Sequence, residues 1–382
     1  MNILIPYHER LPIQKAHDVY LVRTSHALAR AGHTVHLFMG RGSPSLPALL
    51  AYYDLEPTDG IKLHLLPILR RSRGPSWSTP FHLFLWWMIG RLAERGEADV
   101  LFVSTLKLAR LLLRLRWRLP LVYDLHELGA ALGQAAPPSL RRLEAQVLPQ
   151  AHGIVTTTRA LEAQLRRTYP SVGSMAVVPL AVHRPRGLEP EPYPSPGPST
   201  PRAFYVGQLY WLQGLSVALE ALSRSEAPHL YMVGSGNEEV SLRVSAQRLG
   251  IGGRVHFTGF RAPRELPAAM AQAHWFLLPA LGTGRMPYVA HMKCYDYLAY
   301  RRPIIASDLP SVLELLTDGE TALLTSPGDP QALAQAMDRL LKDPDLARCL
   351  ADQAWDLALQ HSPERRAARL TAFFENVRAG RG

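Results

Sequence analysis

The chain of 382 residues is long enough for two domains, each with its own core. Hydrophobic residues make up 47% and charged residues 19%, a composition typical of globular proteins that excludes a disordered chain. The two cysteines, Cys294 and Cys349, form neither a disulfide framework nor a metal-ligand spacing, so we expect no metal and a reducing, cytoplasmic compartment.

The net charge of +10 is concentrated in the first half of the chain. Residues 1–182 hold 21 Lys and Arg against 12 Asp and Glu, whereas residues 183–382 hold 21 against 20. The first half is therefore expected to face something anionic. No helix-turn-helix, zinc spacing or RNA-binding aromatic motif accompanies the charge, so we expect no nucleic acid. No apolar run approaches the roughly 20 residues that cross a bilayer, which predicts a protein that is soluble or peripheral at the inner face of a membrane.

Short apolar runs alternate with helical patterns in the first half. We predict a strand at residues 2–6 in place of a signal peptide, a helix from His17 to Ala31 that stops at Gly32, and a strand at 34–38. Further strands are predicted at 61–66, 99–103, 121–124 and 153–156. Strands that alternate with helices imply a parallel sheet.

A proline-rich segment at 184–202, with seven prolines and two glycines, predicts the domain boundary. After it, strands are predicted at 203–207, 230–233, 255–257, 275–278 and 303–307, and only helices from about Gln331. The predicted fold is α/β, with two doubly wound, Rossmann-like domains facing a cleft. The predicted domains are residues 1–183, the linker 184–202, residues 203–360, and a final helix at 361–382 packing back on the first domain.

Glycines follow several predicted strands of the second half. Gly207, Gly234 and Gly236 would let backbone N–H groups approach a diphosphate at the carboxyl edge of the sheet. Each glycine alone is better explained by a tight turn. Together, on one edge, they favour a phosphate-binding site.

Segments of the second half resemble family-4 retaining glycosyltransferases of the GT-B fold in order and spacing. They are residues 204–209, 213–214, 232–236, 255–260, 273–279, 293–299 and 302–310. The resemblance, which extends over nearly the whole chain, implies transfer of a sugar from a nucleotide-sugar donor to an acceptor glycan, lipid or small molecule, including lipid-linked or cell-envelope glycans. It implies front-face attack with retention at the anomeric carbon. No protein nucleophile, metal or resident cofactor is then expected.

The resemblance also implies a set of donor-binding residues. Asp296 stands where the family has a glutamate that binds the ribose hydroxyls, and a carboxylate can accept both of those hydrogen bonds. Lys293 is expected near the phosphates, or else is a solvated helix lysine, and residues 259–261 are expected to meet the base. The predicted set is Gly207, Gln208, Gln213, Gly234, Gly236, Gly259, Phe260, Arg261, Arg285, Met292, Lys293 and Asp296.

Three further positions depart from the family pattern. Tyr288 replaces a second glutamate, and Gln208 and Gln213 replace cations that neutralise the leaving diphosphate. Losing a cation there costs several kcal/mol of transition-state stabilisation unless another replaces it. Arg261, Arg285 and Lys293 are the candidate replacements. Otherwise the chain is a slow enzyme or a non-catalytic subunit.

In the first half, the resemblance assigns His126, at the end of the strand 121–124, to contact the donor sugar, with Glu127 orienting it. A structural histidine is the alternative. The segment Lys15, Ala16 and His17 is expected on the acceptor side, although the paired glycines of the family are missing there.

A basic amphipathic helix is predicted at 106–119. Lys107, Arg110, Arg114 and Arg118 form one stripe, opposite Leu108, Leu111, Leu112, Leu115 and Leu119. Arg70, Arg71, Arg73 and Trp77 precede an aromatic run at 81–87. This pattern suits an anionic membrane surface or, equally, an ordinary core-facing helix with solvated arginines.

Two rival functions stay open. One is another GT-B enzyme, either a nucleotide-sugar epimerase or an inverting transferase. The other is a catalytically inactive binding subunit, favoured by Gln208, Gln213 and Tyr288.

Overall fold

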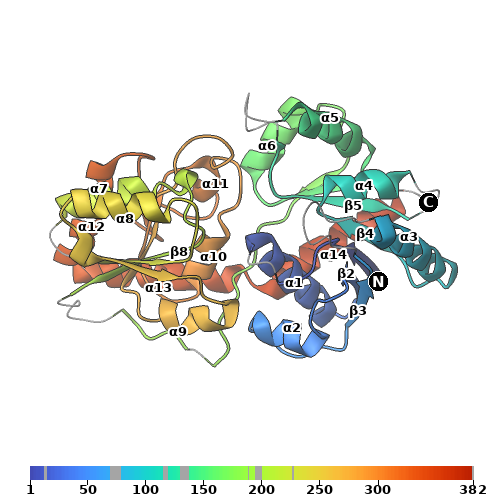
Figure 1. The fold of residues 1–382 in the computed structure, drawn as a ribbon, viewed down its shortest axis with the longest axis horizontal. Helices are drawn as coiled ribbons and strands as arrows, with labels where there is room; N and C mark the ends of the chain where they lie inside the picture. The colour runs from blue at the N-terminus through green and yellow to red at the C-terminus, as the bar shows by residue number, and fades with distance from the viewer. Residues whose placement is uncertain are drawn as a thin grey trace. The chain divides into compact units, whose positions relative to one another are not determined.

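The computed structural model describes residues 1–12, 15–68, 79–114, 119–129, 137–187, 189–193, 200–225 and 228–380. Contacts divide the chain into two compact units, one comprising Met1–Pro179 with Pro363–Gly382 and the other Leu180–Ser362 (Figure 1). Within the described residues, each unit is built around one parallel sheet with helices.

The first unit has a seven-stranded sheet in the order β3-β2-β1-β4-β5-β6-β7, with every pair parallel. The strands are β1 (Asn2–Pro6), β2 (Thr34–Gly40), β3 (Ile61–Leu66), β4 (Val100–Val103), β5 (Leu121–Leu125), β6 (Gly153–Thr156) and β7 (Met175–Val177). The helices are α1 (Ala16–Arg30), α2 (Leu46–Tyr52), α3 (Thr79–Glu94), α4 (Leu106–Leu113), α5 (Pro138–Val147), α6 (Arg159–Thr168) and α14 (Pro363–Ala379).

The core of the first unit follows from its strand sequences. The four residues of β4 are all buried and apolar, because sheets covered on both faces select continuous apolar runs. The five residues of β5 are also buried, Asp124 among them. The C-terminal helix α14 packs against α1, and its Phe374 meets Phe102 of β4 with ring centroids 5.2 Å apart. The last helix of the chain is therefore part of the first unit's core.

The second unit has a six-stranded parallel sheet in the order β10-β9-β8-β11-β12-β13. The strands are β8 (Arg202–Val206), β9 (His229–Val233), β10 (Val255–Gly259), β11 (Trp275–Leu278), β12 (Ile304–Ser307) and β13 (Leu323–Thr325). The helices are α7 (Leu215–Arg224), α8 (Glu239–Arg248), α9 (Leu266–Met270), α10 (Met292–Leu298), α11 (Pro310–Leu313), α12 (Pro330–Lys342) and α13 (Pro344–Gln360). Tyr193, from the proline-rich segment, is buried in this unit's core.

Both sheets reverse their strand order beside the first strand of the unit, between β1 and β4 and between β8 and β11. Such switch points open a crevice at the carboxyl ends of the strands, where doubly wound domains bind ligands. The two-domain, doubly wound prediction is confirmed at the level of fold class.

Some local predictions were wrong. Strands β7 and β13 were not predicted, because three residues carry too little pattern. Helix α4 ends at Leu113, not Leu119, and Leu119 precedes Pro120, which disfavours helical backbone at the preceding residue. Arg70, Arg71, Arg73, Trp77, Leu115 and Arg118 lie outside the described residues.

Candidate functional site

Glycine turns end two central strands of the second unit. Gly234 follows β9 with a φ of +147°, and a Cβ there would lie 1.9 Å from the carbonyl oxygen of Gly207. A Cβ on Gly236 would lie 2.1 Å from the carbonyl oxygen of Leu209. Neither position can hold a side chain without moving backbone, because real Cβ atoms do not approach so closely. The two turns that follow β8 and β9 are thus packed against each other at the sheet's carboxyl edge.

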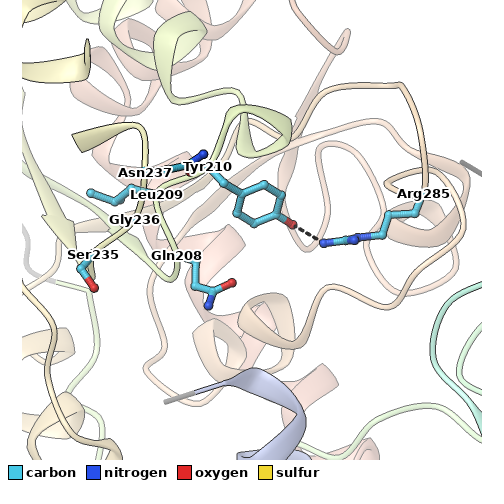
Figure 2. Close-up of a pocket in the computed structure, with 7 residues that line it drawn as sticks. All are labelled: Gln208, Leu209, Tyr210, Ser235, Gly236, Asn237 and Arg285. Atoms are coloured by element: carbon cyan, nitrogen blue, oxygen red, sulfur yellow. Dashed lines mark hydrogen bonds between the residues drawn. The ribbon is translucent and has the colours of Figure 1, made fainter. Parts of the chain in front are cut away.

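A cavity of about 250 Å³ lies beside these turns (Figure 2). Its lining is Gln208, Leu209, Tyr210, Ser235, Gly236, Asn237 and Arg285. Three of these, Gln208, Gly236 and Arg285, belong to the donor-binding set expected from the sequence. The wall combines exposed backbone of the two turns with amide, hydroxyl and guanidinium groups, which are the donors an anionic ligand needs.

Arg285 supplies positive charge to this cavity. Its guanidinium donates a hydrogen bond to the Tyr210 hydroxyl at 3.4 Å, drawn as the dashed line in Figure 2, and lies 5.7 Å from the centre of the Tyr210 ring. A planar guanidinium can still offer further N–H groups to phosphate oxygens from this position. The aromatic contact therefore orients a cation at the cavity wall.

Lys293 lies behind the first glycine turn. Its ammonium donates to the Tyr205 hydroxyl at 3.0 Å and to the side-chain oxygen of Gln213. The space above Gly207 is occupied by this side chain, since a Cβ there would meet the Lys293 Nζ at 3.3 Å. Burial lowers the pKa of Lys293 to about 7. Gln213 is buried and uncharged, and it pairs with the Lys293 cation of helix α10 (Met292–Leu298).

Helix α10 carries three predicted residues, Met292, Lys293 and Asp296. The helix is held at the sheet edge by Tyr297, whose hydroxyl accepts from the Val206 amide at 3.0 Å and donates to the Leu277 carbonyl at 3.3 Å. These bonds join α10 to the carboxyl ends of β8 and β11. Met292 and Asp296 are partly exposed on the helix, and Asp296 follows Lys293 by one turn.

The segment predicted to meet the base follows β10. The carbonyl of Gly259 accepts from the Gly234 amide at 2.9 Å, which joins this segment to the second glycine turn. Phe260 is 39% exposed and Arg261 is exposed. Neither side chain lines the cavity described above.

In the first unit, His126 follows β5 and belongs to a buried polar cluster. Its Nε2 lies 2.9 Å from a carboxylate oxygen of Asp124, and the Tyr20 hydroxyl donates to the same oxygen at 2.7 Å. The Tyr20 ring meets the His126 ring edge-on at 4.1 Å. Burial alone would raise the pKa of Asp124, but the His126 and Arg366 charges and the hydrogen bonds from His126 and Tyr20 hold it below its usual range.

Arg366 connects this cluster to the C-terminal helix. From α14 it donates to the Tyr20 hydroxyl and to the carbonyl oxygens of Val178 and Pro179. The guanidinium also lies 5.1 Å from the Tyr20 ring centre. Tyr20 in turn donates to Asp124. The position of α14 therefore influences the carboxylate that holds His126.

His17 lies against this cluster. Its ring is 5.2 Å from that of His126, and its Nε2 is 3.0 Å from the Ser104 hydroxyl. Burial, reinforced by His126, lowers the pKa of His17 to about 4, so this ring is neutral at pH 7. Lys15, Ala16 and Glu127 are exposed.

Several residues of these sites were not singled out from sequence. Asp124 precedes His126 by two positions at the end of the same strand, so its place in the sequence could have identified it as a neighbour of the histidine. Tyr20 lies one turn after His17 on α1. Tyr210 and Asn237 follow the two glycine turns, where only proximity to the cavity distinguishes them from ordinary loop residues.

The described part of the basic stripe lies on α4. Lys107, Arg110 and Arg114 are exposed, while Leu108 and Leu112 are buried in the first unit. The apolar face of this helix is therefore used by the protein's own core. Among the residues that the structure describes, no helix is both long and apolar enough to span a bilayer.

Comparison with known proteins agrees with the architecture. Residues 17–181 match the family described as "Glycosyl transferase 4-like domain", and residues 200–343 match "Glycosyl transferases group 1". The chain is 16% identical to the Anabaena protein HepE, crystallised with UDP, over 98% of this chain and 100% of that one, with a TM-score of 0.72. The sucrose-phosphate synthase of Thermosynechococcus elongatus gives a TM-score of 0.74 at 20% identity over 99% of each chain. These likenesses define the fold as GT-B.

Sequence relatives point the same way. The D-inositol 3-phosphate glycosyltransferase of Corynebacterium urealyticum is 24% identical over 94% of this chain and 90% of its own length. The alpha-D-kanosaminyltransferase of Streptomyces kanamyceticus is 26% identical, in a match that spans 46% of each chain. With both halves matched to glycosyltransferase families, the chain belongs to the family-4 glycosyltransferases.

Proposed function

We propose that this chain transfers a sugar from a nucleotide-diphosphate sugar to an acceptor hydroxyl with retention of anomeric configuration. The observation that carries the proposal is the cavity beside the two glycine turns, whose wall includes Arg285. Backbone amides and a guanidinium are the groups that stabilise charge on a departing diphosphate. The UDP in the HepE crystal structure supports a nucleotide ligand.

The two glutamines that depart from the family pattern fit this proposal when their surroundings are included. Gln208 lines the cavity together with Arg285, and Gln213 accepts a hydrogen bond from Lys293. A cation therefore accompanies each position. We infer that Arg285 and Lys293 together neutralise the leaving diphosphate, and that Asp296 accepts hydrogen bonds from the ribose hydroxyls.

His126 is proposed to contact the donor sugar. Because the Asp124 carboxylate can only accept, the His126 Nε2 carries the proton of their bond. Nδ1 is then the nitrogen left for a sugar hydroxyl, accepting in the neutral ring and donating in the charged one. By family resemblance, the donor's own phosphate takes the acceptor proton, so the reaction needs no protein nucleophile and no resident cofactor. The proposed acceptor class is a glycan, lipid or small molecule.

The test is a transfer assay with a panel of nucleotide sugars, read by release of nucleoside diphosphate with and without candidate acceptors. The proposal predicts release that requires a sugar donor, and proton NMR of the product should show the donor's anomeric configuration. An inverted product would identify an inverting transferase. A nucleotide sugar with inverted configuration at one ring carbon, formed without transfer, would identify an epimerase. Nucleotide binding without any turnover would identify a non-catalytic subunit.

A further inference from the structure

Helix α3 is apolar on the face that packs into the first unit. Phe81, Leu85, Ile89 and Leu92 recur at helical spacing and are all buried. Such a stripe is what an amphipathic helix requires to join a core. The opposite face of a surface helix is normally polar.

The outward face of α3 is apolar as well. Leu83, Phe84, Trp86 and Trp87 are exposed by 63%, 50%, 49% and 51% of their surface. A single exposed tryptophan, such as Trp211 in the second unit at 58%, needs no explanation. Four large apolar side chains within five consecutive positions form a patch, and patches of this kind mark interaction surfaces.

Positive charge lies at the C-terminal end of this patch. The Arg91 guanidinium lies 5.2 Å from the centre of a Trp87 ring, and Arg95 is exposed just beyond the helix. Glu94, at the last position, is the one carboxylate within the α3 sequence. At the other end, His8 lies within electrostatic reach of both Glu9 and Lys107. Burial lowers the pKa of His8 and of His82, so neither ring adds positive charge at pH 7. Residues 1–182 also carry nearly all of the chain's excess positive charge.

We propose that Leu83, Phe84, Trp86 and Trp87, here called the α3 face, form a docking surface for an anionic phospholipid bilayer. The helix would lie in the plane of the interface, with the tryptophan rings at headgroup depth and the arginines beside lipid phosphates. A second copy of the chain is the weaker occupant, because it brings the same excess of positive charge. Helix α4 contributes mainly charge, since Leu108 and Leu112 are buried and Lys107 and Arg110 are exposed. This inference goes beyond the proposed transfer reaction and does not depend on it.

The experiment is flotation of the full chain with vesicles of phosphatidylcholine, alone or mixed with phosphatidylglycerol. Wild type should float with the anionic vesicles at low salt and should be released as salt screens the attraction. The double substitution Trp86→Gln and Trp87→Gln should lower the partition coefficient by about tenfold or more, because it removes two side chains from the apolar interface. Trp211→Gln, a matched exposed tryptophan on the second unit, should float as wild type does.

Circular dichroism melting of both variants checks that they are folded, as expected for exposed positions. The proposal is overturned if wild type does not float, if it floats equally with phosphatidylcholine alone, or if the double variant floats as wild type does. Light scattering after gel filtration measures the molar mass and so tests whether a second copy of the chain binds the α3 face instead. A dimer that the double substitution disperses, without any flotation of wild type, would assign the α3 face to a second copy and would also overturn the proposal.

Discussion

In the first unit, the strand end that carries His126 is closed by a buried cluster in which Arg366 donates to Tyr20 and Tyr20 donates to Asp124. In the second unit, the equivalent edge is open, with two glycine turns and a cavity. Both edges belong to sheets of the same strand order about their first strand. The difference shows that a shared fold sets where chemistry can occur, whereas the turns and side chains after each strand decide which chemistry it is. One edge is built to hold a side chain rigidly, and the other to admit a ligand.

The largest effect is expected for His126→Ala, which should lower sugar transfer without lowering nucleotide affinity. His126→Ala should reduce sugar transfer by about a hundredfold or more, the cost of losing one preorganised polar contact in a transition state. Nucleotide affinity should change little, because the cavity lies in the other unit. Steady-state transfer rates and calorimetry on one preparation measure both. Transfer within twofold of wild type would make the histidine structural.

Asp296→Ala should act on the second unit alone. The lost hydrogen bonds to a charged group should weaken nucleotide binding by about 1.5–3 kcal/mol. Asp356→Ala, an exposed aspartate on α13, is the matched control and should bind as wild type does. Unchanged affinity in a folded Asp296→Ala protein would remove its assignment to the ribose.

Asp124→Asn should act on the first unit through His126. The amide keeps the shape of the side chain but removes the carboxylate charge that pairs with His126, so the ring should be held less firmly in place. We expect transfer to drop about tenfold with nucleotide affinity unchanged, as for a residue that orients a catalytic group. The NMR chemical shifts of the His126 ring report its environment without any turnover. Identical ring shifts in both proteins would show that the carboxylate does not hold the ring.

The smallest expected effect near neutral pH is a pH dependence from Lys293. Its pKa of about 7 in the free protein means that a bound diphosphate must draw in a proton above that pH. Affinity for a nucleotide sugar should therefore fall as pH rises above about 7, by up to about tenfold per unit until the pKa of the complex is reached. Lys293→Gln should bind more weakly at pH 6.5 and lose the slope. Calorimetry at several pH values measures this, and an equal slope in both proteins would exclude Lys293 as its source.

The sequence allowed the fold to be predicted because most strands are continuous apolar runs between glycine or proline boundaries. It did not allow β7 and β13 to be found, since three residues are too few for a period to show. For the candidate site, the glycine turns and His126 could be located from their place after strands. The pairing of Lys293 with Gln213, 80 positions apart, could not, because only the tertiary fold brings α10 to the first turn. The bond between Arg366 and Tyr20 joins residues 346 positions apart and was equally hidden.

Ligand-induced stabilisation with a panel of nucleoside diphosphates tests the central claim most directly. A ligand that binds only the native state stabilises it by RT ln(1 + L/Kd), where L is the free ligand concentration, so the unfolding temperature rises with ligand concentration. We predict concentration-dependent stabilisation by at least one nucleoside diphosphate, and a clearly weaker effect of the same ligand on Arg285→Gln. Absence of stabilisation by every member of the panel at millimolar concentration, in a folded wild-type protein, would contradict the assignment of the second unit as the nucleotide-sugar site.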